Sequence, residues 1–340
     1  MGFFNPLPLN SALKSDSKGN PPDCQGAKIF AKVREFDYNE VPMDTAKNQK
    51  TAYLYAAVAV FLWSTVATAF KLTLRYTAYP ELLLMSVFFS MTALSMLVTV
   101  QKKWGLLSGL SKSEIMQGIS LGFLNPFLYY FLIFKAYSVL PAQLAQPLNQ
   151  IWGVVIVLLS IPLLKQKIGF TSVFGVIVSF FGVVILSTSG SFSIGDIKEP
   201  LGVSFALLSS IVWSVYWIFN TKSGRDPLIL LLINFFSGFA FSLVYCLVFH
   251  DVGAVSLSAV GGSVYIGLFE MGVTFLVWLK AMKYSVTTAK VSILIYLAPF
   301  LSLVFIHYIL GERILFSSLT GLVFIIAGIL ISRTDRKANS

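Results

Sequence analysis

Long apolar runs, separated by short polar segments, fill the chain from residue 52 to residue 332. A helix needs roughly 20 apolar residues to cross about 30 Å of hydrocarbon, and each run is close to that length. Inside a bilayer a helix satisfies its own backbone polar groups, so each run predicts a transmembrane helix. We therefore expect an all-α polytopic membrane protein with ten transmembrane helices. The predicted spans are residues 52–72, 81–100, 115–137, 141–164, 169–188, 201–220, 228–249, 260–281, 287–310 and 315–332.

Composition agrees with this pattern and marks off the two tails. Of the 340 residues, 56% are hydrophobic and 12% are charged, and the mean hydropathy is +0.79, which is more apolar than a soluble domain. Residues 1–50 are polar and rich in Gly, Pro and Ser, which predicts a largely disordered N-terminal tail. Within it, residues 27–37 fit either a short interfacial helix or an ordinary stretch of tail. Residues 334–340 form a short C-terminal tail.

Charge and motif content narrow the class of protein further. The net charge of +10 comes from Lys and Arg in tails and short loops, so we expect no nucleic-acid partner. These residues concentrate on the side that carries both termini, which predicts a multi-pass protein of the plasma or inner membrane with both termini in the cytoplasm. The two cysteines lie far apart, as do the two histidines, and the sequence lacks P-loop and H-E-x-x-H motifs. We therefore expect no metal, no cofactor and no enzyme activity.

The second half of the sequence repeats the first. Residues 140–186 align without a gap with residues 286–332, and the alignment superposes glycines. Each repeat holds five spans, an odd number, so the second repeat enters the membrane from the opposite side. This predicts two inverted repeats, residues 51–190 and 200–333, with a site near the membrane midplane between them. The aligned glycines are Gly175 with Gly321 and Gly182 with Gly328.

Two motifs point to a known group of proteins. "WS" occurs in the first span of each half, and "LGERILFSSLTGLVFIIAGILI" closes the second half. With these motifs and the repeat, the chain resembles the drug/metabolite transporter superfamily, and within it the EamA family of ten-helix permeases. The resemblance implies a carrier whose central cavity is lined by the first four spans of each half, in a family whose members often export amino acids or other metabolites. The first half departs from the family pattern, because "LKQK" stands where a Gly-Glu pair is common.

Glu270 is the most informative single residue. It lies within the apolar segment 267–275, in the middle of a predicted span, where a charge costs roughly 2.5–3.5 kcal/mol on insertion scales. A carboxylate placed there should face a watery cavity, where it could carry a proton or bind a substrate ammonium group. The alternative is a structural acid that hydrogen bonds to a neighbouring backbone carbonyl. Asn125 occupies the aligned position in the first repeat. The following Pro126 should kink that helix.

Further polar and aromatic positions could line the same cavity. Gln143, Gln146 and Gln150 fall on one helical stripe with Asn149 at its edge, and amides of this kind suit a zwitterion such as an amino acid. The segment "PLNQIW" at residues 147–152 is similar to a motif of aromatic amino-acid exporters, which ranks amino acids first among substrates. Interhelical hydrogen bonding and packing remain the alternative roles for all these side chains. The other candidates for substrate binding are Tyr129, Thr274, Trp63, Trp213, Ser292, Tyr296 and Lys290.

The sequence therefore favours a secondary carrier of small metabolites, amino acids first, that works by alternating access and couples to protons through Glu270. Three alternatives remain: an uncoupled facilitator, an exporter of drugs, nucleosides or sugar phosphates, and, more remotely, an intramembrane enzyme. The expected partners are a small-molecule substrate, protons and the lipid bilayer. The glycine pairs fit close packing within one chain or a contact in a homodimer, so a monomer and a homodimer are both expected states.

Overall fold

Helices follow one another along the chain, and the computed structural model describes residues 48–332 except 165–168, 221–225, 252, 254, 287–290 and 292. The described residues form helices and connecting loops without strands. The predicted interfacial helix at 27–37 lies outside them, as do the C-terminal tail and the N-terminal tail up to residue 47. The first repeat contains α2 (Gln49–Thr73), α3 (Tyr79–Val100), η1 (Trp104–Leu106), α4 (Lys112–Gly122), η2 (Phe123–Leu128), α5 (Tyr129–Val139), α6 (Ala142–Asn149), α7 (Trp152–Leu164) and α8 (Phe170–Ser187).

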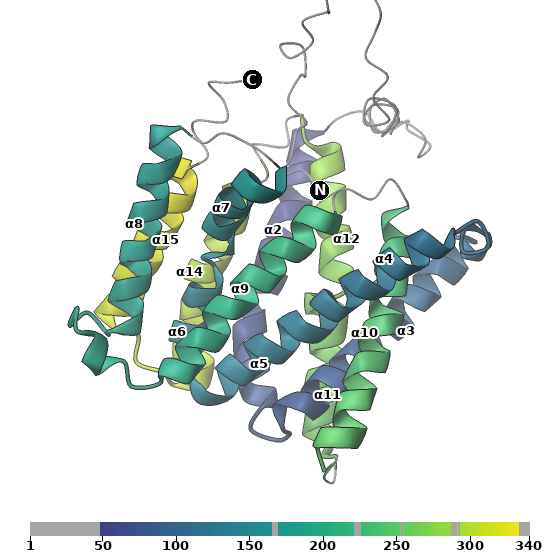
Figure 1. The fold of residues 1–340 in the computed structure, drawn as a ribbon, viewed down its shortest axis with the longest axis horizontal. Coiled ribbons are helices and arrows are strands. Elements are labelled where there is room, and N and C mark those ends of the chain that lie inside the picture. The colour runs from purple at the N-terminus through teal and green to yellow at the C-terminus, as the bar shows by residue number, and fades with distance from the viewer. Residues whose placement is uncertain are drawn as a thin grey trace, which may run out of the picture.

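The second repeat has a similar order of helical segments, although its fourth span divides into η5, α14 and η6 where the first repeat has α6 and α7 (Figure 1). After the short η3 (Ile194–Asp196) come α9 (Pro200–Asn220), α10 (Pro227–Phe249), α11 (Leu257–Tyr265), η4 (Ile266–Glu270), α12 (Val273–Tyr284), η5 (Ile293–Leu297), α14 (Ala298–Phe305), η6 (Ile306–Leu310) and α15 (Phe316–Ser332).

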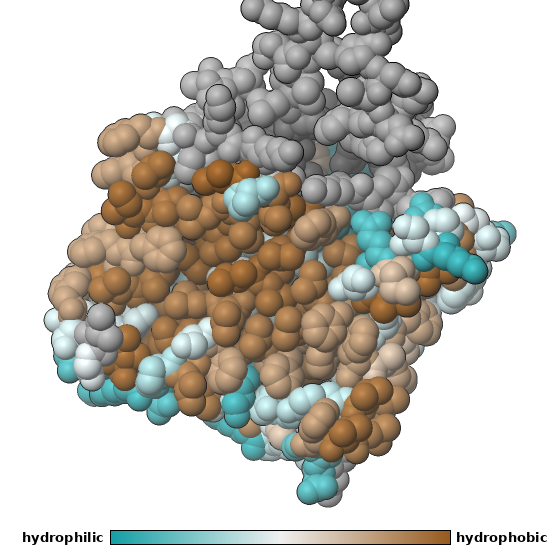
Figure 2. All heavy atoms as spheres, viewed as in Figure 1, coloured by the Kyte–Doolittle hydropathy of each residue, from teal (hydrophilic) through white to brown (hydrophobic). Residues whose placement is uncertain are grey.

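The lengths of these helical segments confirm an all-α, multi-pass membrane fold. Within the described residues, nine segments are long and apolar enough to cross a bilayer. The helix α15 is apolar but shorter, so the tenth crossing stays a prediction. Figure 2 shows apolar side chains covering the middle of the bundle in this view, with polar side chains along its lower edge. A surface of this kind matches a lipid environment on its apolar band and water at its rims.

Contacts between the two repeats follow a two-fold pattern. The fifth helix of each repeat packs on the other, as α8 on α15, and the second helices pair as α3 with α10. The first helix of each repeat, α2 or α9, packs on the third and fourth helices of the opposite repeat. Each contact thus has a counterpart related by exchange of the repeats. The arrangement agrees with the inverted duplication predicted from the sequence.

Glycines allow close contact between the fifth helices of the two repeats. A Cβ atom at Gly175 would lie 2.5 Å from the carbonyl oxygen of Gly328, and one at Gly182 would lie 2.6 Å from that of Gly321. Between the two pairs, the buried Ser179 hydroxyl donates to the carbonyl oxygen of Ile325 at 3.0 Å. The glycine pairs therefore form an internal contact between α8 and α15, which run in opposite directions.

The helix α2 begins and α15 ends on the same side of the bundle (Figure 1). We call this side the terminal face and the other side the opposite face. Turns on the opposite face join α5 to α6 and α14 to α15.

Candidate functional site

The third span of each repeat is interrupted near its middle. In the first repeat, Asn125 leaves helical geometry (φ −148°, ψ 118°) directly before Pro126, so the sequence-predicted kink is present. In the second repeat the break falls at Gly272 (φ −123°, ψ −88°), just beyond Glu270. Breaks of this kind free backbone polar groups within the bundle, where they can meet a polar ligand.

Glu270 ends the π-helical turn η4 and faces the first repeat. Its Oε1 atom accepts a hydrogen bond from the hydroxyl group of Tyr130 on α5 at 3.3 Å. Tyr130 is fully buried, whereas Glu270 is partly exposed. The carboxylate therefore lies at the boundary between the two repeats, held by a donor from the opposite half.

Beside this pair lies a group of polar and aromatic side chains from α5 and two further elements, α6 and α9. The Tyr129 ring packs on the rings of Tyr130 at 4.7 Å and Trp213 at 4.6 Å between centroids. The Tyr129 hydroxyl donates to Asn149 Oδ1 at 3.3 Å, and Asn149 Nδ2 donates to the Ser209 hydroxyl at 2.8 Å. A continuous network thus joins α5 and α6 of the first repeat to α9 and η4 of the second.

Asn125 lies in a second polar group, at the break in the span that also contains Tyr129. Its side chain is 5% exposed, and its Oδ1 atom has no hydrogen-bond partner among the described residues. Elsewhere in this group, the Tyr216 hydroxyl donates to the Asn234 oxygen at 3.3 Å once that amide is oriented to satisfy its neighbours. The structure therefore leaves a buried acceptor at the kink of the third span.

Other sequence-predicted residues lie apart from this network. Gln143 binds the loop before α15, because its Nε2 donates to the Arg313 carbonyl at 2.8 Å and its Oε1 accepts from the Leu315 amide at 2.9 Å. The Trp63 ring packs on the rings of Phe275 and Trp278. Gln143 and Trp63 thus have packing or bridging roles in this conformation.

The remaining candidates are placed as follows. The Gln146 oxygen is buried without a hydrogen-bond partner in the described part of the chain, and the Gln150 oxygen accepts from the Trp152 indole at 3.1 Å. Thr274 is buried and donates to the Phe269 carbonyl. Tyr296 is buried in the core. Lys290 and Ser292 lie outside the described residues.

Two charged residues at the turn between α5 and α6 were not among the predicted site residues. Lys71 Nζ donates to the carbonyl oxygens of Tyr137 at 2.7 Å and Leu140 at 2.6 Å, at the end of α5. The Glu312 carboxylate accepts from the amides of Ala142 at 2.9 Å and Gln143 at 3.2 Å, at the start of α6. Each charge lies at the helix end that its sign favours. The one sequence signal was Glu312 within "LGER".

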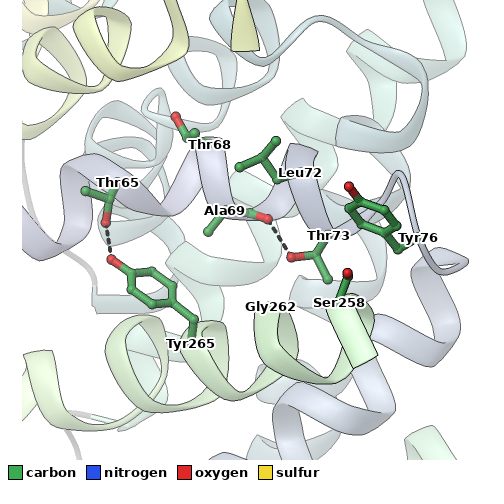
Figure 3. A pocket seen from close by; sticks show the side chains of 9 residues that line it. All are labelled: Thr65, Thr68, Ala69, Leu72, Thr73, Tyr76, Ser258, Gly262 and Tyr265. Atoms are coloured by element: carbon green, nitrogen blue, oxygen red, sulfur yellow. Dashed lines mark hydrogen bonds between the residues drawn. The ribbon is translucent and has the colours of Figure 1, made fainter. Parts of the chain in front are cut away.

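A cavity of about 350 Å³ lies between α2 and α11 (Figure 3). On one side the Thr65 hydroxyl is hydrogen bonded to the Tyr265 hydroxyl at 2.6 Å. The buried Thr68 hydroxyl has no partner among the described residues. Sequence analysis missed this group, although its threonines recur at helical spacing within an apolar span. The lining residues are Thr65, Thr68, Ala69, Leu72, Thr73, Tyr76, Ser258, Gly262 and Tyr265.

The apolar exterior, the two inverted repeats and the interrupted central helices together define a polytopic membrane transporter. The sequence profile of the EamA-like transporter family matches the chain twice, over residues 50–188 and 200–334. The chain therefore belongs to the EamA-like transporter family, within the drug/metabolite transporter superfamily. This membership confirms the family predicted from the sequence, and it implies a small-molecule substrate and a lipid surrounding.

Individual relatives agree with this assignment. The chain is 32% identical over 185 residues to an uncharacterized transporter of Clostridium kluyveri, a match that covers 52% of this chain and 59% of that protein. It is 26% identical over 264 residues to a protein of Ancylobacter novellus named aromatic amino acid exporter YddG, covering 75% of this chain and 87% of that one. A solved crystal structure has the same fold, with a TM-score of 0.58 at 21% identity over 86% of this chain and 100% of that one.

Proposed function

We propose that this protein is a secondary carrier of small amine-bearing metabolites, amino acids first, and that it works by alternating access. The observation that carries the proposal is the network from Glu270 through Tyr130 and Tyr129 to Asn149, because it crosses the boundary between the two repeats. A substrate bound there would contact both repeats. Their relative movement would then open the site to each side of the membrane in turn.

The chemistry of the network suits an amino acid. The Glu270 carboxylate can bind an ammonium group, and the amides of Asn149 and Asn125 can donate to a carboxylate. The Trp213 and Tyr129 rings form an aromatic surface that can pack on an apolar or aromatic side chain. The relative named as an aromatic amino acid exporter supports this choice of substrate class.

Proton coupling and orientation are part of the same proposal. Glu270 would bind the substrate ammonium group in one half of the cycle and a proton in the other. Each transport cycle would therefore carry a proton across the membrane in the direction opposite to the substrate. The protein would lie in the plasma or inner membrane. Both chain termini would lie in the cytoplasm, as the distribution of Lys and Arg indicates. Export would then be driven by the inward proton gradient. Gln146, Gln150, Thr274, Tyr296, Lys290, Ser292, Gln143 and Trp63 are kept as candidates for contact in another conformation.

Transport by purified protein in liposomes tests the proposal. We expect uptake of radiolabelled tryptophan, phenylalanine or leucine to rise when a pH gradient is imposed, and Glu270→Gln to abolish that rise while the protein still folds. Glu199→Gln, which removes an exposed carboxylate in the loop before α9, is the matched control and should transport normally. Gradient-driven flux in Glu270→Gln equal to wild type would rule out proton carriage by Glu270.

The same assay separates the alternatives. An uncoupled facilitator would equilibrate substrate at one rate with or without the gradient. A carrier of another substrate class would transport uridine, glucose 6-phosphate or a cationic drug in place of amino acids. Thermal stabilisation of the detergent-solubilised protein across the same compounds gives an independent measure of binding.

A further inference from the structure

The antiparallel helices α3 and α10 carry a matched polar contact at each end of their pairing (Figure 1). At both ends, an acidic side chain at the start of one helix meets a basic side chain just beyond the end of the other. The two ends lie on opposite faces of the membrane, because the repeats are inverted. The two basic residues differ, however, since one is a lysine and the other a histidine.

On the terminal face the contact is an ion pair. Asp226 caps the start of α10, where its Oδ1 accepts from the Leu228 amide at 2.9 Å. Its Oδ2 lies 2.6 Å from the Nζ atom of Lys103, which follows the end of α3. Lysine and aspartate are residue types that ordinarily stay charged near neutral pH, so this pair is the comparison for the contact at the other end.

On the opposite face the contact is a cluster around Glu81, in the first turn of α3. Glu81 Oε1 accepts from the Gly253 amide at 2.8 Å and lies 3.3 Å from His250 Nε2. Glu81 Oε2 accepts from the Thr77 hydroxyl at 2.5 Å. Glu81 is 8% exposed, so little water competes for these bonds. We call Glu81, Thr77, His250 and Gly253 the histidine latch.

Both partners in the latch lie at helix ends. Glu81 lies at the N-terminal end of α3, and His250 is the C-cap of α10. A negative charge at the first position and a positive charge at the second are each stabilising. Histidine changes its charge between about pH 5 and 8, whereas the equivalent lysine does not. The latch therefore gains an ion pair as the pH falls.

We infer that the histidine latch is a pH-sensitive contact that holds Gly253, in the loop between α10 and α11, more tightly against Glu81 of α3 when the opposite face is acidic. The loop leads directly into α11 and η4, the segment that ends at Glu270. At neutral pH the contact between His250 and Glu81 is weaker, so Gly253 is held less firmly at the start of this segment, while the Lys103–Asp226 pair joins the other end of α3 and α10. The proposed pH response therefore belongs to the contact on the opposite face and not to the Lys103–Asp226 pair.

The neighbouring ionisable groups do not provide this response. Around the latch, α10 contributes Tyr245 and Cys246, whose thiol lies 3.5 Å from the Pro80 carbonyl. The start of α3 contributes Tyr79, and Lys135 of α5 lies over the Tyr79 ring at 4.7 Å. Phenol, thiol and ammonium groups ordinarily keep one charge state between pH 5.5 and 7.5, whereas an imidazole is the side chain that ordinarily changes charge there.

Hydrogen exchange at the Gly253 amide, which donates to Glu81, measures the latch directly. The full-length protein is placed in nanodiscs of neutral lipid, and protection is corrected for the intrinsic pH dependence of exchange. We expect protection to rise about three- to fivefold between pH 7.5 and 5.5, as for a partly exposed ion pair. His250→Gln should remove this rise. His250→Lys, with a permanent charge, should give high protection at both pH values.

Two further variants separate the latch from other titrating groups. His307→Gln changes the other of the two histidines in the sequence and should keep the full pH response. Glu270→Gln should also keep it, so the result does not depend on the proposed transport mechanism. A pH response that survives in His250→Gln, or a flat profile in the wild type, would overturn the inference.

Discussion

At the residue scale, the carboxylate of Glu270 and the hydroxyl of Tyr130 form the contact on which the proposed site depends. The two residues lie in different repeats, so their contact joins the two halves that move relative to each other in the proposed cycle. A hydrogen bond to a charged group contributes about 1.5–3 kcal/mol of stabilising free energy. Loss of the Tyr130 hydroxyl would leave the Glu270 carboxylate without this donor. The tyrosine hydroxyl should therefore influence coupling as well as binding.

Tyr130→Phe tests this contact. We expect gradient-driven transport to fall about tenfold, with little change in thermal stability, because the ring still fills its buried position. Flux is measured in liposomes over a series of internal pH values. Tyr53→Phe, at an exposed position on α2, is the matched control and should behave as wild type. Normal coupled flux in Tyr130→Phe would separate Tyr130 from the transport mechanism.

Glu312 has a structural role that belongs to the same scale. Its carboxylate satisfies two amides at the start of α6, and helix caps of this kind contribute about 1–2 kcal/mol. Glu312→Ala should lower the thermal denaturation midpoint of the solubilised protein by several degrees. Glu199→Ala removes an exposed acid and should leave the midpoint unchanged. Equal midpoints for the two variants would show that the cap contributes no stability.

At the scale of helices, hydropathy and proline predicted much of what the structure contains. The apolar runs located the helical segments, and the Asn125–Pro126 step located the break in the third span. The sequence could not show that Glu270 meets Tyr130, because periodicity tells which face of a helix is polar and not which helix lies opposite. For the same reason, the polar stripe through Gln143 gave no sign that this amide binds the loop before α15.

The contact between α8 and α15 shows how a residue pattern becomes a helix contact. Gly182→Ala places a methyl group 2.6 Å from a backbone oxygen that cannot move aside easily. We expect a loss of about 1–3 kcal/mol in stability, seen as a lower denaturation midpoint. Gly261→Ala, at an exposed position on α11 with open space around the new methyl group, should be neutral or slightly stabilising. Equal effects of the two substitutions would contradict close packing at Gly182.

At the scale of the whole molecule, two repeats with the same topology differ in their chemistry. One repeat carries a carboxylate at the interrupted span and the other carries an amide, at Glu270 and Asn125. The contacts at the ends of α3 and α10 differ in the same way, with histidine at one end and lysine at the other. In the proposed alternating-access cycle, the duplicated fold would supply two related conformations. The differences between the repeats give the two ends of the bundle different side-chain chemistry.

Orientation in the membrane is the whole-molecule property on which the direction of transport depends. In a variant lacking Cys24 and Cys246, a single cysteine is placed at Lys198 on the opposite face or at Ser108 on the terminal face, both exposed. If both termini are cytoplasmic, a membrane-impermeant maleimide added to intact cells labels Lys198→Cys, and it labels Ser108→Cys only after the membrane is permeabilised. The reverse pattern would place the histidine latch inside the cell, where it would sense cytoplasmic pH. Labelling of both positions in intact cells would contradict the inverted arrangement, because the two loops are separated by an odd number of crossings in the predicted topology.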